Sequence, residues 1–150
     1  MGVRFYHVGI VAADPLRLGR FYVEVFDCED LGVRHDVSGA ELAQGMGVPA
    51  AEIKGLDLRL PGFGEGGPIL EIFSLADAAR RRGEVAQTGL MHIAFSVDDV
   101  HATLDRVVAE GGSRLGDIAQ LRVDGVGVAT MVYARDPEGN VIEIQRWDRV

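Results

Sequence analysis

The stretch MHIAFSV, residues Met91–Val97, alternates large apolar residues with smaller or polar ones. A period of two predicts a β-strand with two unlike faces, because successive side chains of a strand point to opposite sides. His92 falls on the less apolar face. Asp98 and Asp99 follow and offer an N-cap for a helix over Val100–Glu110. Taken by itself, His92 is explained by hydrogen bonding inside a core. The same pattern, a strand with a histidine followed by a capped helix, also occurs near the N-terminus.

That second stretch is Val3–Val11, which is predicted to be a strand and contains His7. Asp14 and Pro15 follow it as an N-cap and a first helical residue, and apolar residues then recur at helical spacing up to Phe26. Further strands are predicted in each half of the chain, at Leu31–Val37, Ile53–Leu60 and Ile69–Ser74, and at about Ile118–Val123, Val128–Arg135 and Val141–Arg146.

Each half therefore has the order strand, helix and three strands, with a histidine in its first strand and a glutamate (Glu71 or Glu143) in its last. This internal repeat predicts an α+β fold of two βαβββ modules, at about residues 1–76 and 88–150 of a single domain over residues 1–150. The first half is longer. A Ser38-Gly39-Ala40-Glu41 capping box and a short helix over Glu41–Met46 are predicted in the extra length, around residues 38–50.

Composition excludes several classes of function. The net charge of −8 argues against nucleic acid as a partner, because phosphate contacts need clustered lysine and arginine. The densest basic run, Arg80–Arg82, is short and is interpreted as solvated. Cys28 is the single cysteine, so an internal disulfide is impossible, and burial as a small apolar residue is expected. With no long apolar run, no membrane association is predicted, and a cytoplasmic location is expected.

His7, Glu71, His92 and Glu143 form the candidate site. An ionised carboxylate inside a sheet costs several kcal/mol unless it is paired or bound to a metal. Two such carboxylates at equivalent positions would also repel each other if they converged. One divalent cation (Zn, Ni, Co, Mn or Fe) removes both problems, because imidazole nitrogen and carboxylate oxygen suit these ions. The alternative is that both glutamates face outward and are solvated.

Five segments in order resemble the vicinal oxygen chelate superfamily, which includes glyoxalase I, bleomycin resistance proteins and extradiol dioxygenases. The resemblance covers nearly the whole chain. The last segment is similar to the superfamily's most recognisable motif. The segments are Tyr6–Ile10, Phe21–Phe26, Ile69–Phe73, Gly89–Phe95 and Asp136–Glu143.

The resemblance implies an open, cup-like mixed sheet with flanking helices around one metal, with His7, Glu71, His92 and Glu143 on the four ligand positions. It implies an enzyme, a metal-dependent isomerase or lyase of the glyoxalase I or epimerase type. There the metal polarises adjacent oxygens of a small-molecule substrate and stabilises an enediolate. Glu143 is the preferred proton-transferring base and Glu71 the second choice. A homodimer is expected, while a site within one chain and a site across the dimer both remain open.

Two other functions within the superfamily remain as alternatives. An extradiol-type Fe(II) dioxygenase would use His7, His92 and Glu143 as a facial triad, which leaves Glu71 surplus. A non-enzymatic protein that binds a small molecule or drug would need no metal set. No glutathione-binding set is recognised, and methylmalonyl-CoA epimerase usually has a glutamine where Glu71 stands.

Tyr133 and Arg59 are weaker candidates around the site, and two further histidines are not assigned to it. Tyr133 precedes the Asp-Pro turn on a strand, and the sequence does not determine which face it occupies. Arg59 alternates with leucines and is a candidate to bind a substrate carboxylate or phosphate. For both, placement in the core or on the surface is favoured. His35 and His101 are expected to face solvent.

Overall fold

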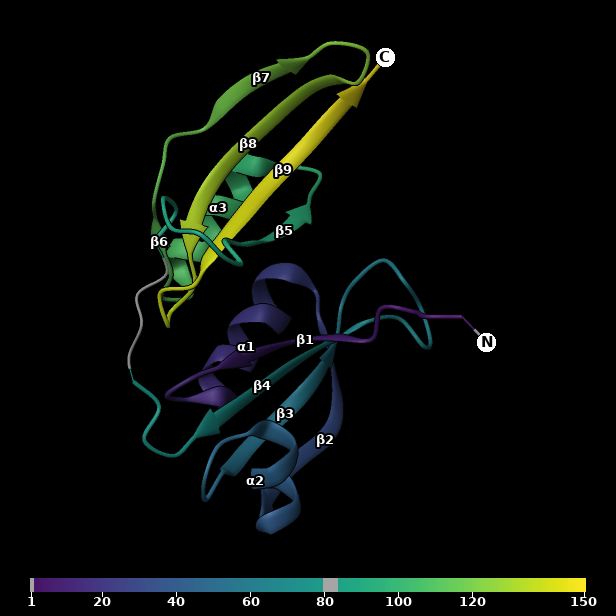
Figure 1. Cartoon of the computed structure of the whole chain (residues 1–150). Coiled ribbons are helices and arrows are strands. Elements are labelled where there is room, and N and C mark those ends of the chain that lie inside the picture. Colours follow the sequence, from purple (N-terminus) through teal and green to yellow (C-terminus); the bar gives the residue numbers. More distant parts are fainter. Residues whose placement is uncertain (1, 80–83) are drawn as a thin grey trace. The chain divides into compact units, whose positions relative to one another are not determined.

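The chain folds into two units, Met1–Arg80 and Arg81–Val150, and each consists of one mixed sheet with a helix packed on it (Figure 1). This computed structural model describes residues 2–79 and 84–150. The Arg80–Arg82 run therefore lies outside the described residues. The arrangement confirms the predicted α+β fold class.

The sheet of the N-terminal unit has the order β1-β4-β3-β2. Its first strand is parallel to the last, and the other neighbours are antiparallel. The elements are β1 (His7–Val11), α1 (Pro15–Phe26), β2 (Glu29–Ser38), α2 (Ala40–Met46), β3 (Glu52–Arg59) and β4 (Ile69–Leu75).

The C-terminal unit repeats this plan with the order β5-β9-β8-β6, and β7 also pairs with β8. Again the first strand is parallel to the last. A two-residue strand, β6, adds to the predicted βαβββ order. The elements are β5 (Ile93–Ser96), α3 (Val100–Ala109), β6 (Ser113–Arg114), β7 (Ala119–Val123), β8 (Gly127–Arg135) and β9 (Val141–Arg149).

Both long helices begin where the sequence predicted. The Asp14 side chain accepts a hydrogen bond from the backbone of Arg17, and Asp99 does the same for Ala102. The short helix α2 differs, because Ser38 is the last residue of β2 and the N-cap is Gly39, which makes no side-chain cap bond. The predicted capping box is therefore wrong, although the helix itself exists.

One face of each sheet forms the core with its helix. Most of the buried strand residues there belong to β3, β4, β8 and β9, at alternating positions such as Leu70 and Ile72 of β4, whereas β2 and β7 have none. The single cysteine is also buried. Loss of solvation, with a smaller effect of the neighbouring Asp27 charge, raises the pKa of the Cys28 thiol to about 12. The fully buried core includes Leu18, Phe21, Tyr22, Leu58, Leu70 and Ile72 in one unit and Leu104, Val107, Val132, Ile142 and Ile144 in the other.

The two histidines of the repeat lie at the N-terminal ends of β1 and β5. β1 begins at His7 and β5 begins one residue after His92, so both strands begin later than the predicted Val3–Val11 and Met91–Val97. Glu71 and Glu143 do lie within strands, and each is the third residue of its strand. Among the described residues, no helix is long and apolar enough to cross a membrane. The expected homodimer and cytoplasmic location stay predictions.

Candidate metal centre

In the C-terminal unit, His92 and Glu143 are direct neighbours. The Nε2 atom of His92 lies 2.9 Å from Oε2 of Glu143, and both side chains are mostly buried. The parallel pairing of β5 with β9 sets Ala94 opposite Glu143, which brings the preceding histidine to the carboxylate. The other ring nitrogen, Nδ1 of His92, is buried without a hydrogen-bond partner in the part of the chain that the structure describes.

The N-terminal unit repeats this pair with a longer distance. The Nε2 atom of His7 lies 3.8 Å from Oε2 of Glu71, and the imidazole is the more exposed of the two, at 43%. Parallel pairing of β1 with β4 sets Gly9 opposite Glu71. Both histidines therefore precede by two residues the position that pairs with the glutamate.

The four predicted ligands thus lie as two equivalent pairs, one in each unit, on the sheet face away from the helix. Each pair offers an imidazole nitrogen and a carboxylate oxygen, a donor set that suits Zn²⁺, Mn²⁺, Fe²⁺ or Co²⁺. A half-buried carboxylate beside a histidine also has spare lone pairs that a cation would satisfy. The residues of each pair therefore fit a metal.

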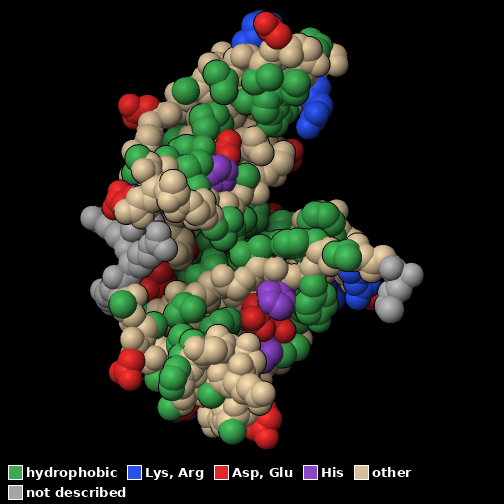
Figure 2. All heavy atoms as spheres, viewed as in Figure 1, with side chains coloured by type: hydrophobic (Ala, Val, Ile, Leu, Met, Phe, Trp, Pro, Cys, Tyr) green, Lys and Arg blue, Asp and Glu red, His purple; other side chains and the backbone are tan. Residues whose placement is uncertain are grey.

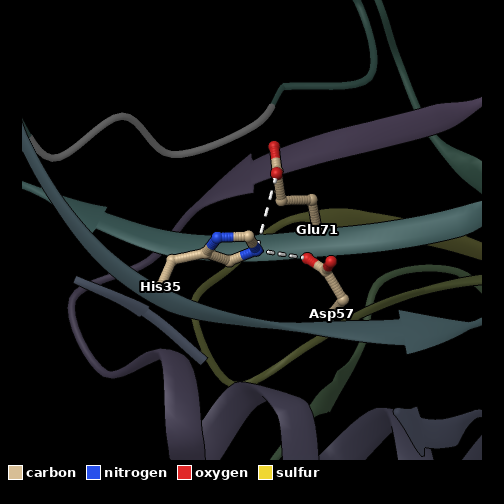
Figure 3. Close-up of side chains that lie close together, drawn as sticks. All are labelled: His35, Asp57 and Glu71. Carbon is tan, nitrogen blue, oxygen red and sulfur yellow. Dashed lines mark hydrogen bonds and ion pairs between the residues drawn. The ribbon is translucent and has the colours of Figure 1, made fainter. Parts of the chain in front are cut away.

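One more carboxylate, Asp57, and one more histidine, His35, lie beside the N-terminal His–Glu pair. Asp57 accepts a hydrogen bond of 2.7 Å from Nε2 of His35, and the same nitrogen lies 3.8 Å from Oε1 of Glu71 (Figure 3). Both side chains are partly buried, so the prediction that His35 faces solvent is wrong. In Figure 2, histidine and acidic side chains gather over the sheet of this unit.

The sequence did hold a signal for Asp57. It stands between Leu56 and Leu58 in a strand, the same pattern that identified Glu71 between two apolar neighbours. Pairing of β3 with β4 sets Asp57 directly opposite Glu71, which the periodicity of either strand alone does not predict.

Tyr133 has the corresponding place in the C-terminal unit, because β8 sets it directly opposite Glu143. Its ring centroid lies 5.1 Å from that of His92. Burial raises the pKa of the Tyr133 hydroxyl, and the negative charge of Glu143 raises it further. Tyr133 therefore belongs to this site as a neutral donor beside the carboxylate.

Two of the other candidates lie elsewhere. Arg59 forms an ion pair of 2.7 Å with Glu29 across β2 and β3. The exposed His101 on α3 agrees with its prediction as a solvent-facing residue. Neither contributes to the His–Glu pairs.

Fold and site together define a protein of two repeated βαβββ units, each with a candidate metal-ligating His–Glu pair. A family profile described as the Glyoxalase/Bleomycin resistance protein/Dioxygenase superfamily matches residues 4–144. The chain belongs to this superfamily, which agrees with the resemblance found in its sequence. A search of curated protein sequences returns no significant match.

Solved structures agree with this fold. A glyoxalase family protein from Bacillus cereus has a TM-score of 0.73 at 17% identity, with 97% of this chain and 93% of that chain covered. A glyoxalase family protein from Enterococcus faecalis is 25% identical, with a TM-score of 0.59 and coverage of 95% and 96%. The fosfomycin resistance protein FosX from Listeria monocytogenes was solved as a mutant with Mn(II) and 1S,2S-dihydroxypropylphosphonic acid. It is 16% identical, with a TM-score of 0.57 and coverage of 96% and 92%.

Proposed function

We propose that this protein is a metal-dependent isomerase or lyase of the glyoxalase or epimerase type, acting on a small molecule with adjacent oxygens. His7, Glu71, His92 and Glu143 are its proposed ligands for one divalent cation. The observation that carries the proposal is the same His–Glu pair at the same strand register in both units.

The donor chemistry supports this choice over a purely structural role. Four ligands of mixed nitrogen and oxygen type suit Zn, Ni, Co, Mn or Fe, and FosX, a structural neighbour, was solved with Mn(II). When bound, the ion would supply a Lewis acid for the substrate's adjacent oxygens. Equivalent placement of Glu71 and Glu143 favours four ligands over the three that an extradiol dioxygenase would use.

Glu143 is the proposed base. Its carboxylate would take a proton from the substrate carbon beside a carbonyl and return it to the neighbouring carbon. Tyr133 lies opposite on β8, and a protonated hydroxyl there is a donor for the developing negative charge on substrate oxygen. Glu71 is the alternative base.

The test uses untagged full-length protein reconstituted with Mn²⁺, Co²⁺, Ni²⁺, Fe²⁺ or Zn²⁺. We expect bound metal in the wild type and in H101A, and the loss of one ion in H7A and in H92A, with all variants folded by circular dichroism. A panel of 2-oxoaldehyde hemithioacetals and acyl-CoA substrates in D₂O should show metal-dependent deuterium incorporation by NMR.

Other outcomes would replace the proposal. Oxygen consumption with catechols would identify an Fe(II) dioxygenase. Tight binding of small molecules by metal-free protein, together with a metal content that H7A and H92A leave unchanged, would identify a non-enzymatic binding protein.

A further inference from the structure

Three side chains of the N-terminal unit converge on its exposed sheet face from adjacent strands. His35 comes from β2, Asp57 from β3 and Glu71 from β4 (Figure 3). One ligand atom from each lies within 4.8 Å of the others. The proposed four-ligand centre uses only Glu71 of these three, so it leaves the convergence of His35 and Asp57 unexplained.

Among the described residues, no lysine or arginine forms an ion pair with the two carboxylates of this cluster. Asp57 and Glu71 are directly opposite on antiparallel strands, where like charges destabilise a sheet. Among the described residues, the ion pairs of these two carboxylates are with His35 and His7. The nearest lysine in the strand, Lys54, pairs with other acids. The half-buried carboxylates therefore favour a cation from solution.

We propose that His35, Asp57 and Glu71 bind a second divalent cation. Metal bonds of about 2.0–2.2 Å to nitrogen and oxygen place ligand atoms roughly 3–4 Å apart. The separation between His35 and Glu71 is 3.8 Å, and that between His35 and Asp57 is 2.7 Å. The third separation, between oxygens of Asp57 and Glu71, lies within 4.8 Å. The 2.7 Å separation must widen, by a side-chain rotation. One nitrogen and two oxygens suit Zn²⁺, Co²⁺ or Mn²⁺ and leave coordination positions open.

Glu71 would bridge the two ions. Its Oε1 faces His35 and its Oε2 faces His7, each at 3.8 Å, so the two oxygens point to different histidines. Carboxylates in two-metal sites bind ions about 3.5–4 Å apart. The C-terminal unit has no counterpart, because Tyr133 stands in the place of Asp57 and Ala119 in that of His35. Binding of this ion by His35, Asp57 and Glu71 does not depend on the proposed catalytic function, whereas the bridging role of Glu71 rests on it.

Co²⁺ is the probe, because its binding to the full chain is followed by equilibrium dialysis and by visible absorption. We expect two Co²⁺ per chain in the wild type and one in H35A and D57N, with affinity for the second ion lowered at least tenfold. The matched controls are H101A, the exposed histidine, and D36N, an exposed aspartate beside His35. Both should keep two ions.

The variant H92A separates this inference from the proposed function. If it keeps a cation that H35A and D57N lose, the second site exists whatever becomes of the four-ligand centre. If H35A and D57N bind as much Co²⁺ as H101A and D36N, and with the same affinity, the second site is refuted. H35Q provides a second variant if H35A does not fold.

Discussion

The two units share a backbone plan and a His–Glu pair, but they differ in what stands opposite the glutamate. In the N-terminal unit the opposite residue is Asp57, a second carboxylate with its own histidine. In the C-terminal unit it is Tyr133, a neutral donor. The repeat therefore conserves the pair that is suited to hold a cation, while the neighbouring strand gives each glutamate a different chemical setting.

This difference separates the roles that we propose for the two carboxylates. Glu71 lies between two histidines and opposite another acid, which suits a residue that holds cations. Glu143 has one histidine and a tyrosine, and it is the less exposed of the two, at 15% against 24%. The neutral Tyr133 hydroxyl opposite Glu143 suits a proton-transferring carboxylate, because it is a donor for the substrate oxygen on which negative charge develops.

The largest expected effect is that of removing the base. E143Q should lower the rate of deuterium exchange by about 10²- to 10⁴-fold, the usual contribution of a general base, while the amide oxygen retains part of the metal affinity. Compared with E143Q, E71Q should lower the metal affinity more, and it should lower turnover at saturating metal less. The measurement is kcat together with bound metal for both variants, with H101A as the control. If E71Q loses turnover and E143Q keeps it, the two roles are exchanged.

The hairpins that close the two sheets differ as much as the sites do. Between β8 and β9, the buried Asp136 accepts hydrogen bonds from the backbone of Glu138 and Asn140 and from the Asn140 amide. The longer loop between β3 and β4 is mostly exposed and contains Glu65. The turn between β8 and β9 is therefore fixed by the hydrogen bonds of a buried carboxylate, whereas Glu65 in the loop between β3 and β4 is exposed.

D136A should destabilise the protein by about 2–4 kcal/mol, because it leaves several donors of the turn unsatisfied. E65A in the other loop is the matched control and should change stability by less than about 0.5 kcal/mol. Urea unfolding of both variants measures the difference. Equal stabilities would mean that the hydrogen bonds of Asp136 are replaced by water without loss.

Features that depend on residues close together in the sequence were predictable, whereas features that depend on the alignment of different strands were not. The Asp14 and Asp99 caps and the burial of Cys28 follow from neighbouring residues, and the sequence predicted them correctly. The pairing of His35 with Asp57 depends on how β2 lies against β3, and a register shift between Asp30 and Arg34 alters that alignment. Periodicity places a side chain on a face but does not say which side chain of another strand it meets.

The N-terminal unit also has glycine at two positions of its polar face where the C-terminal unit has side chains. Gly9 corresponds to Ala94, and Gly55 corresponds to Met131, by their pairing with the last strand of each unit. An added Cβ at Gly9 would make ordinary contacts, with Phe73 at 3.8 Å. These two glycines therefore test whether the units are interchangeable at equivalent positions.

G55A should cost about 1–3 kcal/mol, because its Cβ would overlap the backbone oxygen of Ile72 and lie 2.7 Å from Cβ of Phe73, which forces β3 and β4 apart. G9A should be neutral to within about 0.5 kcal/mol, since the other unit already has alanine there. Thermal unfolding measures both. Because Asp57 and Glu71 lie on the strands that G55A separates, the variant should also weaken the second Co²⁺, whereas G9A should not. If G55A were as stable as G9A, the close approach of β3 to β4 would be absent, and with it the geometry that sets the two carboxylates opposite each other.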